Sequence, residues 1–308
     1  MVYRRHHALE FTEYHSPDGH VYKFSDADRF LLTEEGFGMP PIEYITQRGP
    51  YQHGETVIDY RLGTRVIQLL HRRDTCSRDD YWTARNDILD YLRPNRQALG
   101  TVLPGHLLKR MPDGRKRQID VLVEQGPIFG ARDTKQWDEW AYTETIRFIA
   151  FNPIWYDPAQ VCYTWGLTTH NNLILPFTLP FSLGAWIDDS VTILYDGTWE
   201  TFPLIQVTGP VNGLIITNQG TGDFIHLGYN IPGGRTVTIT LDYGHKTVTD
   251  DLGNNLIGIV TPDSDLATFS ILPDPQVAGG TNIINVYGTG VNLQTVITIA
   301  YFRRFIGI

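Results

Sequence analysis

Two pairs of neighbouring carboxylates are the first residues whose type and spacing suggest chemistry. Asp188-Asp189 and Asp250-Asp251 each place two acids side by side. Glycoside hydrolysis uses two carboxyl groups that face each other across a cleft at about 5–9 Å. Adjacent aspartates more often hydrogen-bond the backbone of a turn or face solvent, and we expect both pairs to lie in turns.

Histidines and cysteines are the next candidate ligands. His6 and His7 are adjacent, with His15 and His20 nearby. Adjacent side chains in an extended strand point to opposite faces, so His6 and His7 cannot chelate one ion locally. The two cysteines, at positions 76 and 162, lack zinc-type spacing and form no disulfide framework. We expect both to be small packing residues.

Enzyme motifs are missing from the sequence. It contains no G-x-S-x-G elbow, no H-E-x-x-H helix, no phosphate-binding loop and no dinucleotide fingerprint between a strand and a helix. Gly36-Phe37-Gly38 stands before two prolines and is interpreted as a loop. The sequence therefore predicts a protein that is not an enzyme, without catalytic, cofactor-binding or metal-binding residues.

A basic cluster brackets the turn at residues 112–114 and consists of Lys109, Arg110, Arg115, Lys116 and Arg117. Three interpretations stay open: a solvated hairpin end, a contact with an acidic face of a neighbouring subunit, or nucleic-acid binding. No aromatic residues interleave the cluster as stacking platforms, which disfavours the third. Six aromatic residues of the second half could stack on sugars or fill a core: Trp186, Tyr195, Trp199, Phe202, Tyr229 and Tyr243.

The first half of the chain mixes strands with one helix. Alternating apolar residues predict strands at about 8–14, 21–24, 56–62, 64–71, 107–111, 115–124 and 137–151. Ser77 and Asp80 form a capping box that begins a helix over about 78–92. Tyr81, Ala84, Ile88 and Leu92 form its apolar stripe, and Pro94 ends it.

The second half is predicted to be all β. Residues 152–160 contain two prolines and no periodicity, so we place a domain boundary there and expect domains at 1–157 and 158–308. Short strands follow at about 191–195, 202–207, 213–218, 223–227, 235–242, 245–249, 256–259, 282–287 and 293–301. Turn residues separate them every ~8–12 positions, which is typical of a β-sandwich.

Composition and charge agree with two different domains. Of the 308 residues, 42% are hydrophobic and 19% charged, as in globular proteins. Residues 1–157 hold 21 Lys and Arg against 23 Asp and Glu, and residues 158–308 hold 4 against 11. The acidic net charge of −9 disfavours general binding to phosphate backbones. No signal-peptide-like or membrane-spanning run occurs, so we expect a soluble protein made in a cytoplasm.

Ordered segments along the whole chain resemble the distal tail proteins of siphophages. Residues 44–69 (YITQRGPYQHGETVIDYRLGTRVIQL) are similar to the family's R-G-P-x-x-x-G segment and the strands after it. The helix ending Leu92-Arg93-Pro94 and the junction Trp155-Tyr156-Asp157 follow in the family's order. The run Gly209-Pro210-Val211-Asn212 and residues 232–242 resemble its galectin-like domain.

This resemblance implies a mainly β structural virion protein: an α+β N-terminal domain with one helix and a C-terminal galectin-like β-sandwich. It implies a homo-oligomeric ring, of six subunits, at the tail tip, built by the N-terminal domains and assembled in the host cytoplasm. The ring would join the tail tube protein to tip hub or fibre proteins and let DNA pass through its lumen. No cofactor or membrane is expected. One alternative is a carbohydrate-binding module for the host surface, although the galectins' own sugar motif is absent. A further alternative is a wall- or glycan-degrading enzyme, which would need catalytic carboxylates facing one cleft.

Overall fold

The computed structural model describes residues 10–26, 28–94, 102–129, 140–166 and 186–308. His6 and His7 lie outside these residues. The chain forms two compact units, the first comprising Met1–Pro158 with Phe305–Ile308 and the second Ala159–Arg304. Both units are mainly β, which confirms the predicted fold class. In the described part of the chain, no helix has the length and apolar character needed to cross a membrane.

The first unit is built from two sheets that share one long strand. Its elements are β1 (Phe11–His15), β2 (Val21–Lys23), β3 (Arg29–Glu35), β4 (Ile42–Gln47), β5 (Thr56–Leu62), β6 (Arg65–Thr75), α1 (Arg78–Tyr91), β7 (Gly105–Arg110), β8 (Lys116–Phe129), β9 (Trp140–Ala150) and the start of β10 (Trp155–Gly166). The first part of β8 pairs with β7, in the order β2-β1-β7-β8, and its second part pairs with β9, in the order β3-β6-β9-β8. The strand β8 therefore holds the two sheets together.

Strand β6 carries the side chains that organise the core of this unit. Its alternation turns Ile67 and Leu69 inward, where they join residues of β8, β9 and α1 in one apolar cluster. The same alternation buries Arg65 at one end of the strand. Burial lowers the pKa of Arg65 to about 10, so its guanidinium stays charged at neutral pH.

The Arg65 guanidinium hydrogen-bonds four backbone carbonyls from three separate segments. It donates to Pro153 O at 2.8 Å, to Gly36 O at 2.7 Å and to Ile306 O at 2.6 Å, and also to Gly38 O. One side chain thereby ties residues 36–38, 153 and 306 together, because a planar guanidinium can satisfy several acceptors at once.

A buried acid–histidine pair lies further along the same strand. His71 Nδ1 and Glu144 Oε1 are 2.8 Å apart, and both side chains are fully buried. Burial raises the pKa of Glu144, and the neighbouring His71 and Arg73 oppose that shift. The ring of Tyr22 meets the His71 ring edge-on. The Phe24 ring also meets His71 edge-on, so the pair is flanked by aromatic rings of the core.

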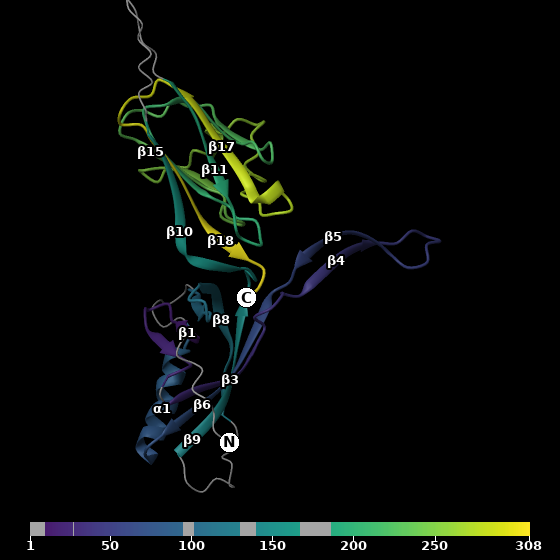
Figure 1. Cartoon of the computed structure of the whole chain (residues 1–308), viewed down its shortest axis with the longest axis vertical. Helices are drawn as coiled ribbons and strands as arrows, with labels where there is room; N and C mark the ends of the chain where they lie inside the picture. Colours follow the sequence, from purple (N-terminus) through teal and green to yellow (C-terminus); the bar gives the residue numbers. More distant parts are fainter. Residues whose placement is uncertain (1–9, 27, 95–101, 130–139, 167–185) are drawn as a thin grey trace, which may run out of the picture. The chain divides into compact units, whose positions relative to one another are not determined.

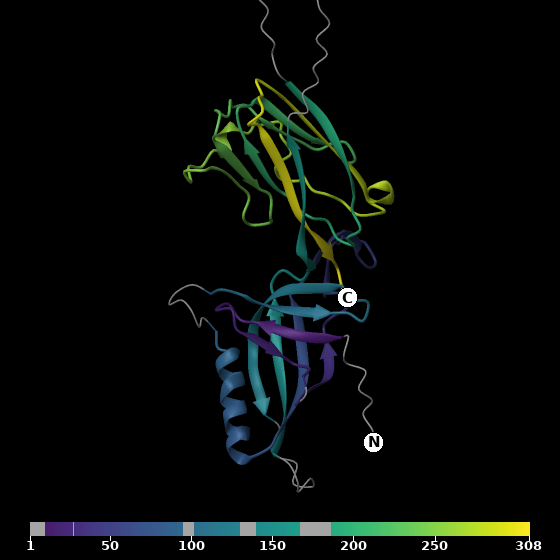
Figure 2. The same cartoon turned by 60° about the vertical axis from the view of Figure 1, so that its left-hand side comes forward.

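Helix α1 begins where the sequence predicts and covers strands of this unit (Figure 2). The Ser77 hydroxyl accepts a hydrogen bond from Asp80 N at 3.1 Å, which satisfies one free amide of the first turn. Ala84 and Ile88 are buried from the helix, and Leu92 just after it. The stripe of the amphipathic pattern is therefore core packing.

The second unit is a β-sandwich. One sheet has the order β16-β15-β12-β18-β10 and the other β11-β17-β13-β14. Its further elements are β11 (Trp186–Leu194), β12 (Leu204–Thr208), β13 (Asn212–Asn218), β14 (Phe224–Leu227), β15 (Thr236–Thr240), β16 (Thr247–Asp250), two 3₁₀ turns η1 (Ile257–Ile259) and η2 (Ala278–Gly280), β17 (Thr281–Thr289) and β18 (Val296–Phe305). Inward side chains of both sheets, such as Ile205, Ile299 and Ile284, form one apolar cluster.

Residues 155–160 belong to β10 despite Pro158, and Tyr156 pairs there with Gln118. Two expectations about these elements are wrong. Within the predicted strand 256–259, Ile257–Ile259 form a 3₁₀ turn, because the amide of Ile259 bonds back to Leu256 O. Asp188-Asp189 lies inside β11 rather than in a turn.

The expectation that both cysteines pack inside the protein is also wrong, because Cys76 and Cys162 are exposed. Cys162 lies on β10, where the alternate residues Val161 and Tyr163 pack against the core. The side chain of Cys162 therefore takes the opposite face. Cys76 is in the short connection before α1.

Candidate functional site

Strands β4 and β5 form a hairpin that pairs with no other strand in the described structure (Figure 1). We call residues 42–62 the arm. The arm continues the line of β3 and β6 away from the core of the first unit. A two-stranded hairpin alone is marginally stable in water, so this element is expected to gain from a partner.

The arm exposes apolar side chains on both faces. Tyr44 pairs directly with Tyr60, so the two rings share one face, and Ile45 next to Tyr44 lies on the other. Tyr44 is 63% exposed, and Val57 and Ile58 are exposed to a similar degree. Large exposed apolar patches of this kind mark interaction surfaces. The arm therefore has the surface character of a contact site.

The basic cluster of the β7–β8 hairpin divides into buried and exposed members. Lys109 Nζ lies 2.8 Å from Glu10 Oε1 and 2.5 Å from Glu34 Oε2, and its side chain is buried. Arg117 is also buried, 3.6 Å from an Asp157 carboxylate oxygen and over the Phe305 ring. These two cations are thus held within their own unit.

The remaining three basic residues are nearer the surface. Arg110 lies over the ring of Phe11, and Arg115 pairs with Asp113 in the turn, at 2.6 Å. Lys116 is exposed. The predicted contact with a neighbouring subunit stays a prediction, and its exposed candidates are Arg115 and Lys116.

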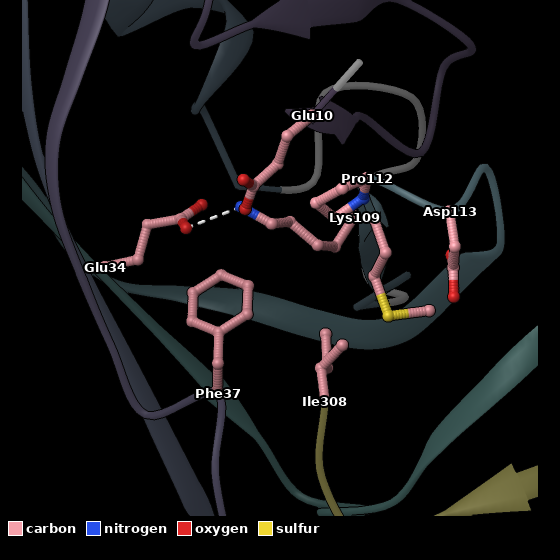
Figure 3. Close-up of a pocket in the computed structure, with 8 residues that line it drawn as sticks. Glu10, Glu34, Phe37, Lys109, Pro112, Asp113 and Ile308 are labelled. Carbon is pink, nitrogen blue, oxygen red and sulfur yellow. Dashed lines mark hydrogen bonds and ion pairs between the residues drawn. The ribbon is translucent and has the colours of Figure 1, made fainter. Parts of the chain in front are cut away.

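An open pocket lies beside this hairpin (Figure 3). Its volume is about 450 Å³. Phe37, Met111 and Ile308 supply apolar atoms. Lys109 lies between Glu10 and Glu34, above Phe37 and Ile308 in the view of Figure 3. Pro112 and Asp113 complete the lining. Sequence reasoning missed this pocket because its walls come from four separated segments.

The histidines and paired aspartates considered as candidate ligands do not come together in one site in the described residues. His15 stacks on His106, and His20 is half-exposed near Asp18. Within the described ranges, no group of three or more His, Cys, Asp or Glu side chains is placed to hold a metal ion. Asp188 and Asp189 point to opposite faces of β11. Asp250 accepts hydrogen bonds from the amides of Leu252 and Asn254, as expected of a turn.

The six aromatic residues of the second half separate into core and surface. Tyr195 and Phe202 are buried in the sandwich, and Trp199 is half-buried. Trp186, Tyr229 and Tyr243 are exposed, Tyr243 by 72%. Trp186 lies on β11, whereas Tyr229 and Tyr243 lie in the connections that follow β14 and β15.

Comparison with known proteins agrees with the resemblance noted in the sequence. Residues 196–305 match the family model of the siphovirus-type tail component, C-terminal domain. The chain shares the fold of the Dit protein (gp 19.1) of phage SPP1, whose crystal structure is described as a paradigm of the hub adsorption apparatus in phages that infect Gram-positive bacteria. That match has a TM-score of 0.63 at 13% identity and covers 96% of this chain and 99% of that chain.

Two structures of the phage p2 baseplate in its activated conformation, one with Sr and one with Ca, also match. Each has a TM-score of 0.41 at 11% identity and covers 95% of this chain and 98% of that chain. A search of the curated proteins gave no match. The predicted likeness to distal tail proteins is confirmed by the family match and the SPP1 Dit fold, and together they support a structural component of the distal phage tail.

Proposed function

We propose that this chain assembles into a closed ring at the tip of a phage tail, where it joins the tail tube to hub or fibre proteins. The family match of residues 196–305 and the shared fold support a structural role over an enzymatic one. Six copies per ring follow from the family resemblance. Residues 1–157 would build the ring and residues 158–308, a galectin-like domain, would project from it.

The β4–β5 arm is the observation that carries the proposal. A ring requires one face of each subunit to bind a different face of the next, with a rotation that closes. An arm with exposed apolar side chains on both faces, and with no further strand paired to it in the described residues, is suited to such a contact. Its apolar surface would be buried once per subunit around the ring.

The charges of the first unit suit a lumen that lets DNA pass. A strongly basic wall would hold the phosphates of DNA. Lys109 and Arg117 are occupied by carboxylates of their own unit. We expect the exposed pair, Arg115 and Lys116, to face a protein neighbour or solvent rather than the bore, and an assembled structure with these side chains lining the bore would refute this.

Mass measurement of the purified full chain tests the ring. We expect a single species at six times the 35.0 kDa of one chain, formed cooperatively with concentration. The double variant Tyr44→Ser, Tyr60→Ser should stay monomeric. The matched control, Tyr229→Ser with Tyr243→Ser, removes two exposed tyrosines from the second unit and should assemble normally. An open ladder of sizes, or wild-type monomers at every concentration, would contradict the ring.

Carbohydrate binding at the host surface is the second candidate. The exposed rings of Tyr243 and Trp186 favour it, because aromatic faces stack on sugars. Host wall glycans titrated into the full chain would quench tryptophan fluorescence if Trp186 takes part. Absence of glycan binding would remove this candidate, and binding unchanged by Tyr243→Ala and Trp186→Ala would exclude these two rings as its site.

A further inference from the structure

The pocket beside the β7–β8 hairpin has an apolar floor that is held in place. The Phe37 ring stacks on Trp155 at 5.3 Å between centroids. The amide of Ile308 donates to Phe37 O at 3.1 Å, which fixes Ile308 next to it. Figure 3 shows both side chains pointing toward Lys109 from below. A preformed apolar floor favours a ligand with a flat apolar body.

The rim of the pocket carries an excess of negative charge. Glu10, Glu34 and Asp113 contribute three carboxylates, against the Lys109 ammonium and the Arg115 guanidinium that pairs with Asp113. Of the two acids paired with Lys109, Glu10 is the more accessible, with 39% of its side chain exposed against 24% for Glu34. The rim therefore favours a ligand that brings hydrogen-bond donors or a positive charge.

The tip of the arm carries both an aromatic ring and a positive charge. Tyr51 is 98% exposed, so its ring contributes no packing within the chain. Arg48 precedes it, and no carboxylate occurs between Glu43 and Glu55. The tip is ordered by its own hydrogen bonds, from Gln52 N to Gly49 O and from Gly49 N to Gln52 Oε1. It therefore presents an aromatic ring and a cation on an ordered backbone, so that the entropy lost on binding is mainly that of the two side chains.

We propose that Tyr51 of one copy binds in this pocket of the next copy, over Phe37 and Met111, with Arg48 directed at Glu10. This inference rests on the proposed ring and names the surface that receives the arm. No residue of the arm lines the pocket of its own unit. One arm tip and one pocket per chain give the head-to-tail contact that a closed ring repeats.

Disulfide trapping tests the contact directly. The native cysteines are first removed by Cys76→Ser and Cys162→Ser, and Tyr51→Cys is then combined with Met111→Cys in the full chain. Mild oxidation at a raised concentration, where mass measurement shows that this variant still forms rings, should yield covalent dimers and higher multimers on a non-reducing gel. Trapped monomers would show the arm folded onto its own pocket and would overturn the inference. If mass measurement shows rings but no multimers are trapped, this inference is wrong and the proposed ring still stands. If no ring forms, both the inference and the proposed ring are wrong.

Removing the aromatic side chain of Tyr51 gives a second test of the contact, and this test does not depend on folding. Because Tyr51 is almost fully exposed, Tyr51→Ala should leave the unfolding midpoint of the monomer unchanged. It should raise the concentration for half-assembly at least tenfold, while Tyr243→Ala, the same change in the second unit, should leave it as in the wild type. Equal half-assembly concentrations for the Tyr51→Ala variant and the wild type would overturn the inference.

Discussion

Replacing Arg65 by methionine should destabilise the first unit strongly. Methionine keeps much of the apolar stem but none of the donors, so the carbonyls of Gly36, Gly38, Pro153 and Ile306 all lose a charged partner. Hydrogen bonds to charged groups are worth roughly 1.5–3 kcal/mol each. Bonds within one network do not add, and water can reach part of the site once it opens. We therefore expect a loss of about 3–5 kcal/mol for Arg65→Met.

The matched control is Arg61→Met on the arm. Arg61 pairs with Glu43 at 2.7 Å, but its side chain is 72% exposed. Exposed ion pairs contribute about 0–1 kcal/mol, so this control should unfold nearly as the wild type does. The two substitutions are chemically identical and differ in burial and in the number of carbonyl partners.

The assay is urea unfolding of the full chain, combined with hydrogen exchange of residues 305–308. Two compact units can unfold in separate transitions, and only the transition of the first unit should move in Arg65→Met. The amide of Ile308, which bonds to Phe37 O, should also exchange faster. If the urea midpoint of the first unit is the same in Arg65→Met and Arg61→Met, the stability of this unit does not depend on the hydrogen bonds from the Arg65 guanidinium to the four carbonyls.

Three further predictions concern local features. Ser77→Ala should cost about 0.5–2 kcal/mol by removing the cap of α1, and an unchanged denaturant midpoint would mean that Ser77 does not act as the cap. Burial raises the pKa of Glu144, so its contribution to stability is present below the ordinary carboxyl pKa of 4.5 and is lost as the pH rises through the raised value. The stability of Glu144→Gln relative to the wild type should therefore increase from about pH 4 to pH 8, and parallel pH profiles for the two proteins would contradict the shift. A fragment of residues 159–304 should fold alone as a β-sandwich, and a helical or unfolded circular dichroism spectrum would disprove it.

Local signals in the sequence predict the local elements well. The capping residues Ser77 and Asp80 and the stop at Pro94 define α1, because each acts within one turn of its own position. The hairpin β7–β8 follows from the Pro-Asp-Gly turn at residues 112–114 for the same reason. Strand alternation similarly predicts most of the sandwich.

Features that depend on distant partners could not be predicted in this way. The burial of Lys109 depends on Glu34, 75 residues away in sequence, and that of Arg117 on Asp157 and Phe305. The exposure of Cys162 depends on which face of β10 meets the core. The exposure of the arm could not be predicted from the sequence either, because its tyrosines and isoleucines have the composition of a buried strand.

The return of residues 305–308 to the first unit has a genetic consequence. The chain leaves this unit after Pro158 and re-enters it at Phe305, and Arg117 touches both Asp157 and Phe305. A stop codon after residue 304 would leave the coding sequence of the second unit whole, yet it would deprive Arg65 of the Ile306 carbonyl and the core of the Phe305 ring. Conversely, an exchange of codons 159–304 as one block would keep every core residue of the first unit, so the second unit can be replaced without altering that core.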